Sequence, residues 1–501
     1  NTTSLRRQLL QAGKIEQIVD LPQGIWSDAN VDCVLLFILE ETSESKRRVQ
    51  QTRINLLGIR DTLERLTARD WDETIIQQQS RWIDHPKCEL DIRYDSLMQQ
   101  IEDACRIQDN GSTKVLRLNH VTESTQGIKP YSTKAQGQAN LYIKPRRNVP
   151  ANESDWKPLI DNSSFIGRYE FRWSHQKPYL KYGNWLDRPR EPRFFDAPKL
   201  LVHGIRNRAL KRRLVAVYDE QKFYNRHNFH NIILRDKQPY DLKYILALFN
   251  SSLLNAWYRS RFDNVNINPS YFRQLPICPA DADTQAEFVK VVDKILAKNV
   301  ELNEFRKQGY TIRKRGDGSS LIEVPYVKVL AEIQQNNPNY STLTLFEAKA
   351  VGLFSLPDRC DLQVTVSSNV YTPDRYPESV VLRHNKLWLV VPDEDVRRYL
   401  LGYLKLRQWQ GKTWDEIKNQ ATLPAEPAEL NLFFTAEEQR RNEIQTLLNE
   451  VAQMDAEIDE RVLDLYGITD LSDRQRILGS AVSSEEEESQ ESEGETVSEE
   501  E

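Results

Sequence analysis

The stretch at residues 15–40, IEQIVDLPQGIWSDANVDCVLLFILE, decides the fold class of the N-terminal region. It holds two strand-length apolar runs, IEQIVDL and VDCVLLFILE, joined by the polar segment PQGIWSDAN. Continuous apolar runs are typical of strands that are buried on both faces, as in an α/β sheet. Because two strands alone are marginally stable, we expect the remainder of this sheet to precede Asn1, and we expect the chain to be part of a larger polypeptide.

Composition excludes several classes of protein. The chain has 501 residues, 39% of them hydrophobic and 28% charged, which is enough for about three domains at roughly 150 residues each. The longest apolar run, residues 34–39, is far shorter than the ~20 residues of a membrane span. The five cysteines are scattered without a CxxC pair. We therefore expect reduced thiols, a cytoplasmic location and no zinc ribbon.

Charge is strongly segregated along the chain. Residues 141–280 hold 25 Lys and Arg against 12 Asp and Glu, and 23 of the 46 aromatic residues. A basic segment this rich in aromatics can bind phosphates while its rings and polar groups meet bases. The alternative is a protein with a basic surface and an aromatic core, which would have the same composition without binding nucleic acid. Residues 485–501 instead contain ten glutamates and no basic residue, so we expect a disordered, solubilising tail at 481–501.

Helices are predicted at 61–69, 95–107, 284–305 and from Thr435 to about residue 466. Thr284 and Glu287 fit a capping box at the start of the third helix. The last helix has apolar residues at near-heptad spacing, which is typical of a helix that pairs with another helix. These apolar residues are Ile444, Leu448, Val451, Ile458, Val462 and Leu465.

Motifs for catalysis are absent or weak. The one GxG, at residues 316–318, lies in an apparent hairpin and predicts a turn. Amino-methyltransferases carry a polar residue, two prolines and an aromatic, which hold the target amine of a flipped base. Residues 268–271 (NPSY) and 337–340 (NPNY) lack the second proline. We interpret both as structural.

The remaining candidates for a metal or a nucleophile are equally weak. Short ExK triplets at 220–222 and 347–349 arise often by chance, and a metal nuclease also needs an acidic residue on a neighbouring strand. The seven histidines show no metal-binding spacing. His227 and His230 are predicted to be loop contacts or core polar groups. We predict no catalytic residue and no metal ligand in this chain.

The order of several segments resembles a known family. Residues 1–41 resemble the end of the methyltransferase domain of adenine-specific DNA methyltransferases. The segments VTESTQGIKPYSTKAQGQA, DWKPLIDNSSFIGRYEFRW and YLKYGNWLDRPREPRFFDAPKLLVHGI resemble the TaqI-like specificity domain of single-chain restriction–modification enzymes and related phage-defence methylases. The usual ending of that domain is similar to three further segments: AVYDEQKFYNRHNFHNIIL, YILALFNSSLLNAWYRSRF and INPSYFRQLPICP. The C-terminal end of these enzymes is similar to DERVLDLYGITD. Residues 306–434 resemble nothing we can name.

The resemblance implies an α+β fold: the truncated edge of an α/β methyltransferase sheet, a mixed α/β DNA-recognition domain, and a helical and β C-terminal region. It implies double-stranded DNA as partner, with a flipped adenine methylated from S-adenosylmethionine at a site outside this chain. Mg²⁺ would be needed if an endonuclease is fused. The expected domains are residues 1–45 (end of the methyltransferase domain), 46–112 (connector), 113–280 (recognition), 281–480 (C-terminal region) and 481–501 (acidic tail).

Within the recognition domain, loop residues are the candidate phosphate or base contacts, while for each one an ordinary solvated charge remains the alternative. The GIRNR loop, residues 204–208, is the first choice because an apparent strand precedes it. The candidates are Arg172, Lys177, Lys181, Tyr182, Arg188, Arg190, Arg193, Arg206, Asn207, Arg208, Lys211, Arg212, Arg213, Lys222, Arg226 and Asn228. Tyr182 and Trp185 flank Gly183 closely, and such aromatics stack on bases or pack in a core.

Two other interpretations remain open. The chain could be a non-enzymatic specificity subunit that acts with a separate catalytic chain; half a sheet at its start argues against this. Residues 306–434 could be a cleavage or partner module. The helix at 436–466 could mediate a homodimer or bind a partner, or it could fold back on its own chain.

Overall fold

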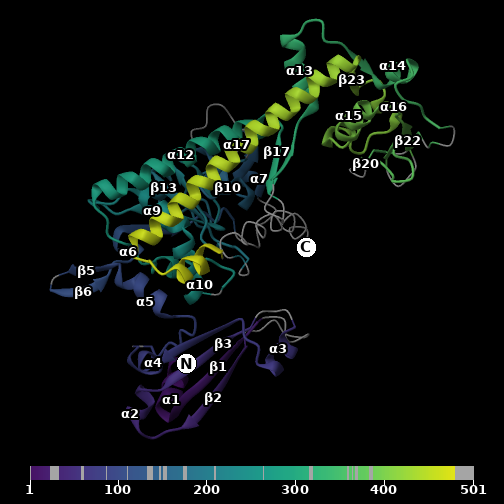
Figure 1. Ribbon diagram of the computed structural model, residues 1–501. Coiled ribbons are helices and arrows are strands. Elements are labelled where there is room, and N and C mark those ends of the chain that lie inside the picture. The colour runs from purple at the N-terminus through teal and green to yellow at the C-terminus, as the bar shows by residue number, and fades with distance from the viewer. Residues whose placement is uncertain are drawn as a thin grey trace. The chain divides into compact units, whose positions relative to one another are not determined.

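A computed structural model describes most of the chain, which forms two compact units (Figure 1). Unit 1 comprises residues 1–297 and 453–501, and unit 2 comprises residues 298–452. The described residues are 2–22, 33–57, 61–85, 87–109, 111–131, 139–145, 148–149, 155–172, 178–207, 210, 212–262, 264–314, 320–357, 360, 362–363, 365–366, 370–382 and 387–479. The predicted GxG turn and the acidic tail lie outside them.

Both units contain helices and short strands in several small sheets, which confirms the α+β class. Unit 1 contains α1 (Thr2–Ala12), β1 (Gly13–Leu21), β2 (Cys33–Glu40), α2 (Glu44–Arg48), β3 (Gln51–Leu56), α3 (Thr62–Ala68), β4 (Glu73–Gln78), α4 (Ser80–Asp84), α5 (Ser96–Asp103), β5 (Arg106–Asp109), β6 (Ser112–Val115), α6 (Leu118–Val121), β7 (Thr122–Gln126), α7 (Ala139–Tyr142), β8 (Ile143–Pro145), β9 (Trp156–Ile160), η3 (Ser163–Phe165), β10 (Ile166–Gly167), β11 (Glu170–Phe171), β12 (Pro178–Lys181), α8 (Arg193–Asp196), β13 (Lys199–His203), β14 (Ala216–Asp219), β15 (Tyr224–Asn225), β16 (Phe229–Leu234), α9 (Leu242–Asn250), α10 (Ser252–Arg261) and α11 (Pro269–Phe272).

Unit 2 is built around its own core, to which helices and hairpins contribute. It contains β17 (Thr311–Lys314), β18 (Ser320–Glu323), α13 (Tyr326–Asn336), β19 (Thr342–Thr344), α14 (Leu345–Ala350), β20 (Val370–Tyr371), β21 (Ser379–Leu382), β22 (Leu387–Val390), α15 (Glu394–Leu404), η4 (Arg407–Trp409), α16 (Trp414–Ile417) and β23 (Thr422–Pro424). Aromatic rings pack closely in this core; Tyr326 and Phe433 have centroids 4.6 Å apart. The paired strands β17 and β18 flank the predicted turn at 316–318.

The predicted strand pair at the N-terminus is confirmed. β1 and β2 pair antiparallel, and β1 also pairs parallel with β3, in a sheet of order β2-β1-β3-β4. The predicted domain boundary at residue 45 therefore falls within one sheet. One face packs against α1 and α4 in a core that includes Ile15, Ile18 and Trp82.

The expectation that both strands are buried on both faces is correct for β1 and wrong for β2. On β2, Leu35, Phe37 and Leu39 are 38%, 50% and 51% exposed. Strand side chains alternate between faces, so these three residues lie on the face away from Ile18. Among the described residues β2 pairs with β1 alone, so its other edge is open and apolar, which natural proteins ordinarily avoid.

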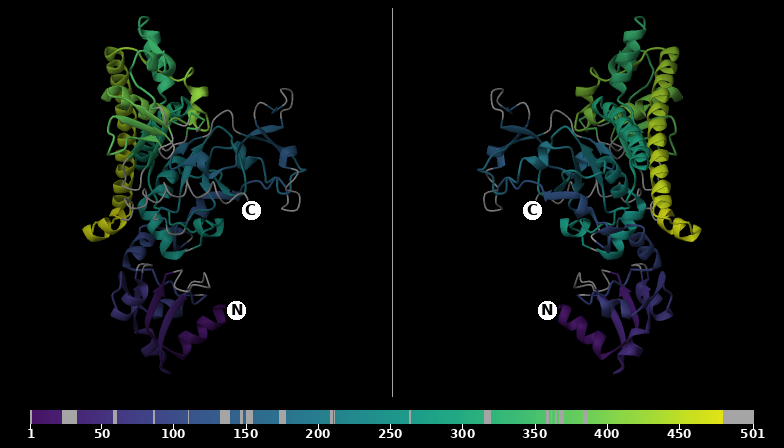
Figure 2. Two further views of the ribbon diagram at one scale, coloured as in Figure 1. Left: turned by 90° about the vertical axis from the view of Figure 1, so that its right-hand side faces the viewer. Right: turned by 90° about the vertical axis from the view of Figure 1, so that its left-hand side faces the viewer.

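The long helices α12 (Ala282–Lys307) and α17 (Pro427–Leu465) each contribute residues to both units. Within unit 1, Arg461 pairs with Glu287 at 3.6 Å, and within unit 2, Lys298 pairs with Glu450 at 3.0 Å, so the two helices contact each other in each unit. Figure 2 shows α17, in yellow, as one uninterrupted helix. Its apolar residues Ile444, Ile458 and Val462 are fully buried, whereas Leu448, Val451 and Leu465 are partly buried, so part of the predicted heptad face is covered by this chain.

Both predicted helix starts in this pair differ from the structure. α12 begins at Ala282 rather than residue 284, because the carboxylate of Asp281 accepts a hydrogen bond from Thr284 N at 2.8 Å. α17 begins eight residues before Thr435. There Glu429 accepts hydrogen bonds from the N–H groups of Ala425 and Glu426 at 2.9 and 3.1 Å, which satisfies the free donors of a helix start.

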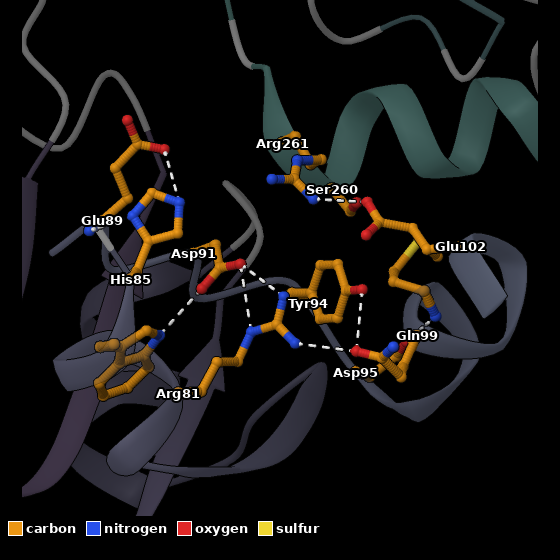
Figure 3. Close-up of polar contacts among 12 residues, drawn as sticks. Arg81, His85, Glu89, Asp91, Tyr94, Asp95, Gln99, Glu102, Ser260 and Arg261 are labelled. Carbon is orange, nitrogen blue, oxygen red and sulfur yellow. Dashed lines mark hydrogen bonds and ion pairs between the residues drawn. The ribbon is translucent and has the colours of Figure 1, made fainter. Parts of the chain in front are cut away.

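A polar network joins the segment at 81–102 to α10 within unit 1 (Figure 3). The guanidinium of Arg81 lies 3.3 Å from the Tyr94 ring centroid, and that of Arg261 lies 5.4 Å from it. Glu102 accepts a hydrogen bond from Arg261 at 2.9 Å. Burial, and then the charge of Glu102, raise the pKa of Tyr94 to about 12. The network thus connects the N-terminal sheet region to the recognition region through charged contacts.

Several smaller expectations can be checked directly. None of the five cysteines forms a disulfide within the described chain. No described helix combines the length and apolar character needed to cross a bilayer. In NPSY, Asn268 caps α11 by accepting a hydrogen bond from Ser270 N at 3.0 Å, and Pro269 occupies the first turn. This is the structural role that we predicted for the motif.

Candidate nucleic-acid interface

Three chain segments meet where the strands of the sheet β14-β13-β16-β7 begin or end, on one side of that sheet. β16 pairs antiparallel with both β13 and β7. In antiparallel neighbours the end of one strand lies beside the start of the other. The ends of β7 and β13 therefore lie on either side of residues 226–228, which lead into β16.

Two glycines allow the close approach of these segments. Gly127 N donates to Phe229 O at 2.8 Å, and Gly204 N donates to Asn228 O at 2.7 Å. A Cβ on Gly127 would lie 2.0 Å from Arg226 O, and one on Gly204 would lie 2.6 Å from Asn228 O. Any side chain at either position would push residues 226–228 away from the strand ends.

The loop between β12 and α8 joins these segments through Arg188, and five cationic or titratable side chains come together. We call them the cationic cluster: Lys129, Arg188, Arg190, Arg226 and His227. Backbone bridges join residue 128 to Arg226 and Lys129 to Arg188. Arg190 Nη2 lies 3.4 Å from Gln126 Oε1. Among the described residues, the carboxylate that forms an ion pair with the cluster is that of Asp187, 3.5 Å from Lys129 Nζ. The cluster therefore keeps a clear excess of positive charge.

The electrostatics of the cluster show this excess. Burial, followed by the charges of Arg226, Lys129 and Arg188, lowers the pKa of His227, so its imidazole is held neutral. Burial and then Arg188 lower the pKa of Arg190. Like charges disfavour further protonation. An anion placed here would relieve the repulsion, so the cluster is suited to bind one.

Unused hydrogen-bonding atoms accompany the charge. Within the described part of the chain, Arg226 Nε, His227 Nδ1 and Asn228 Oδ1 are buried and have no hydrogen-bond partner. Buried polar atoms nearly always have partners in native proteins, so exceptions need an explanation. Because these three atoms are themselves buried, a ligand with donors and acceptors would supply the missing bonds only after the side chains turn toward it. The ring of Tyr131 lies 6.0 Å from the Arg226 guanidinium and borders the same place.

The sixteen predicted contact residues fall into distinct environments. Arg188, Arg190, Arg226 and Asn228 lie at the cluster edge. Six others are exposed or half-buried away from the cluster: Arg172, Lys181, Tyr182, Arg193, Asn207 and Lys222. Three are buried: Arg206, Arg212 and Arg213. The last three, Lys177, Arg208 and Lys211, lie outside the described residues. Residues far apart in the sequence thus form the cluster, and it is not centred on the GIRNR loop.

Some of the predicted contacts have partners within the protein. Arg193 pairs with Glu123 at 2.6 Å and with Glu191 at 2.8 Å. Tyr182 donates to Arg190 O at 2.8 Å, and its ring packs 5.0 Å from Tyr224 in a core cluster. Tyr182 is thereby a core residue whose hydroxyl is occupied, as the alternative interpretation of such aromatics held.

Arg212 belongs to a second arrangement, which we call the buried ion-pair network: Arg168, Arg212, Ser252, Asp455 and Asp459. Arg212 lies 3.2 Å from Asp455 and 2.9 Å from Asp459, and Arg168 pairs with Asp455. Ser252 donates to Asp459 from N at 2.7 Å and from Oγ at 2.6 Å. Arg212 is 6% exposed. We therefore leave it out of the proposed contacts.

Arg213 and Arg206 are also enclosed by protein. Arg213 is fully buried, donates to Asn264 O and lies 5.9 Å from the Tyr258 ring centroid. Arg206 is 8% exposed, and its backbone N donates to Val265 O. Neither guanidinium is presented to solvent, so we do not propose either as a DNA contact.

Sequence reasoning missed Gln126 and Lys129 as parts of the site. Both lie in VTESTQGIKPYS, a segment that carried the family resemblance but no run of basic residues. Gly127, which lies between them, was the available signal, because glycine permits close backbone approach. Among the described residues, no three His, Cys, Asp or Glu side chains are grouped to hold a metal ion.

A sheet edge with clustered Arg, Lys and neutral His side chains can bind the phosphates of DNA and place polar atoms at base edges. Residues 157–277 match the family of the TaqI-like C-terminal specificity domain. This part of the chain, which contains most of the cationic cluster, is similar to the specificity domain of restriction–modification enzymes, as the resemblance predicted. No curated protein matches the sequence.

Two solved structures are similar in part. The type IIL restriction–modification enzyme MmeI, solved with DNA, is 12% identical with a TM-score of 0.34, covering 60% of this chain and 40% of its own. The specificity subunit of a type I restriction–modification system from M. genitalium is 9% identical with a TM-score of 0.32, covering 72% of this chain and 98% of its own. The chain thus spans well under half the length of the MmeI protein. Because both TM-scores are low, we rest no conclusion on these two structures.

Proposed function

We propose that this chain is the DNA sequence-recognition part of a site-specific adenine DNA methyltransferase that acts in restriction–modification or phage defence. The cationic cluster is the observation that carries the proposal. It holds excess positive charge and unused hydrogen-bonding atoms at one sheet edge, within a segment that includes the specificity-domain match. Its Arg and Lys side chains would bind phosphates, and Asn228 and His227 would reach base edges.

The N-terminal sheet supports a catalytic partner. β2 has an open edge and exposes Leu35, Phe37 and Leu39 on one face. A further segment of polypeptide that adds a strand to β2 and covers this face would remove both features. We infer that this segment carries the methyltransferase site, which would bind S-adenosylmethionine and methylate an adenine flipped from the duplex. We assign no residue of this chain to that cofactor.

The alternative, a specificity subunit with a separate catalytic chain, makes the same use of the cationic cluster. It differs in where the catalytic segment is encoded. The exposed edge of β2 favours a segment that shares a sheet with this chain, because a subunit that binds by surface contact does not need an unpaired apolar strand. Co-purification of a strand-contributing catalytic chain would favour the two-chain form.

The test is DNA binding by two matched variants. Arg188→Ala with Arg226→Ala removes two cluster charges, and Arg193→Ala removes an exposed arginine that is already paired with Glu123 and Glu191. We expect the double variant to weaken duplex binding and to reduce the slope of log affinity against log salt by about two. We expect Arg193→Ala to change the slope little. Unchanged affinity of the double variant at low salt would overturn the proposed interface.

The methylation part needs its own readout. The complete protein, expressed in cells without DNA methylation, should place N6-methyladenine at one recurring sequence. The Arg188→Ala, Arg226→Ala variant should reduce the occupancy of that sequence while the protein level stays the same. Methylated cytosine, or no methylated base in a protein that binds a defined sequence, would refute adenine methylation and leave DNA recognition intact.

A further inference from the structure

Trp185 presents an indole ring to solvent in a fixed position. It lies in the loop between β12 and α8, and it is 51% exposed. A Cβ on Gly183 would lie 2.3 Å from Trp185 Cη2, so the six-membered ring rests directly on the glycine. The indole Nε1 donates to Lys181 O at 3.3 Å, and Leu186 N donates to Gly183 O at 3.2 Å, which closes the turn beneath the ring.

Trp185 is the most exposed of the described tryptophans, among which Trp71 and Trp388 are partly buried. The tryptophans Trp82, Trp257, Trp414, Trp409 and Trp156 are all buried, at 8% exposed or less. An indole is large and mainly apolar, so burial would ordinarily be favourable. The turn instead holds the ring outside the core cluster in which the neighbouring Tyr182 packs. Gly183 is what permits this, because any other residue would displace the ring.

The loop also fixes Trp185 close to the cationic cluster. Asp187 N donates to Pro130 O at 3.3 Å, Arg188 N donates to Lys129 O at 2.9 Å, and Lys129 N donates to Arg188 O at 3.2 Å. The backbone two and three residues after Trp185 is therefore bound to the segment that carries Lys129. An exposed aromatic ring beside phosphate-binding cations is the arrangement that binds nucleobases by stacking.

We propose that Trp185 stacks on a nucleobase that leaves its regular position in the duplex when the cationic cluster binds the neighbouring phosphates. The proposal rests on the proposed DNA-binding function and deepens it by naming the ligand of one residue: an unstacked base. The indole acts by stacking, and its Nε1 stays bound to Lys181 O. Stacking on a displaced base stabilises a distorted duplex, at the cost of breaking the base stack.

The geometry favours a base over a protein ligand. One face of the indole ring rests on Gly183, and its Nε1 donates to Lys181 O. The other face is therefore flat and apolar, and the nearby cationic cluster is positively charged. A nucleic acid supplies both flat rings and negative charge. An apolar protein surface would supply neither charge nor a reason for the adjacent cluster.

The experiment compares Trp185→Ala and Trp185→Phe, with Phe346→Ala as control. Phe346 is an aromatic side chain of similar exposure, at 58%, and it belongs to unit 2. Duplexes containing the recognised sequence would carry 2-aminopurine at successive positions, since its fluorescence rises on unstacking and is quenched by an indole. Affinity would be measured for the paired duplex and for the same duplex with one mismatch, which lowers the cost of unstacking.

We expect the wild type to quench 2-aminopurine at one position and Trp185→Ala to lose that quenching. Trp185→Ala should lower affinity about 5- to 150-fold, the range for loss of one base-stacking contact, and Trp185→Phe should lower it less. The salt slope should not change, because no charge is lost. The mismatch should increase wild-type affinity more than that of Trp185→Ala.

The result that would overturn the proposal is equal affinity and equal fluorescence of wild type and Trp185→Ala on both duplexes, with the cluster variant still defective in binding. If the wild type binds no duplex, the proposed function fails as well, so the two failures are distinguishable. Trp185→Ala should unfold at the wild-type temperature or above it, because the ring is half exposed. A lower unfolding temperature with unchanged DNA binding would assign Trp185 a structural role and also refute the proposal.

Discussion

The cationic cluster and the buried ion-pair network use arginines from the same basic segment in opposite ways. In the cluster, Arg188 and Arg226 lie beside other cations, and burial, followed by these charges, lowers the pKa of His227. In the network, Arg212 lies between Asp455 and Asp459 and is almost inaccessible. An arginine whose neighbours are cations is available to an anion. One that is neutralised by carboxylates fixes the structure.

The difference teaches that the count of basic residues in a segment does not identify its contacts with DNA. Arg212 sits in the run KRR, the densest basic triplet of the segment, and yet it is neutralised. Arg226 is separated from other basic residues in the sequence, and the fold places it in the cluster. Whether an arginine is free to bind an anion depends on whether the fold places a distant acidic residue beside it.

The largest effect should come from breaking the network. Asp459→Ala removes the acceptor of Arg212 and of two hydrogen bonds from Ser252. It leaves a buried guanidinium without one of its two carboxylates, so we expect a loss of about 3–5 kcal/mol in the free energy of unfolding. Urea denaturation measures it.

The control for this variant is Asp464→Ala, five residues further along α17. The Asp464 side chain is 70% exposed and pairs with Arg474. Exposed pairs contribute at most about 1 kcal/mol. Equal losses in the free energy of unfolding for both variants would mean that the buried ion-pair network stabilises the protein no more than an exposed ion pair does. The contrast with the cationic cluster would then be refuted.

A smaller effect should follow from separating the segments of the cluster. Gly127→Ala places a Cβ 2.0 Å from Arg226 O, where backbone must move. We expect a loss of about 1–3 kcal/mol in stability, and weaker duplex binding because Arg226 moves away from Lys129. Gly479→Ala, at a glycine with no such neighbour within 4 Å, is the control. Binding at wild-type strength by a folded Gly127→Ala protein would show that the cluster does not depend on the close approach of Gly127 to Arg226.

The smallest effect concerns pH. The lowered pKa of His227 in the free protein means that protonation is disfavoured in the folded state, so stability falls as the pH drops from about 6.5, the unfolded value, toward the lower folded pKa. Phosphates on the cluster would raise this pKa, so DNA binding should take up a proton. Duplex affinity should therefore rise about two- to fivefold from pH 7.5 to 6.0.

His227→Gln tests this coupling. The variant keeps a polar side chain but does not titrate, so its affinity should vary less with pH over the same range. Identical pH profiles for variant and wild type would show that His227 does not sense bound phosphate, and would separate it from the rest of the cluster.

Much of the fold could be predicted from local pattern. The two apolar runs at 15–40 predicted the strand pair because period and length are local properties. The long helices were also predicted, although their starts were misplaced: Asp281 and Glu429 supply the caps, and neither stands in the expected capping pattern. The parallel pairing of β1 with β3 was not predictable, because a crossover gives no local signal.

The sequence identified the segment of the candidate site, and the structure adds the surroundings of each residue in it. The basic, aromatic segment pointed to DNA recognition, and the match at 157–277 supports that assignment. The choice among individual arginines stays a prediction, and Arg212 shows why the sequence does not decide it: its partners Asp455 and Asp459 are 243 and 247 residues away. Tyr182 and Trp185 stand three residues apart in one loop, and only the contact of the Trp185 ring with Gly183 separates the exposed ring from the core ring.

The ion-pair network also has a consequence for synthesis on the ribosome. Arg212 and Asp459 are 247 residues apart in the chain, and all of unit 2 is encoded between them. At roughly 5–20 residues per second, Asp459 is made about 12–50 seconds after Arg212. During that interval the nascent recognition region holds a positive charge that nothing yet neutralises. A translation product that stops near residue 452 would keep it permanently, so completion of unit 1 reports that the whole of unit 2 has been translated.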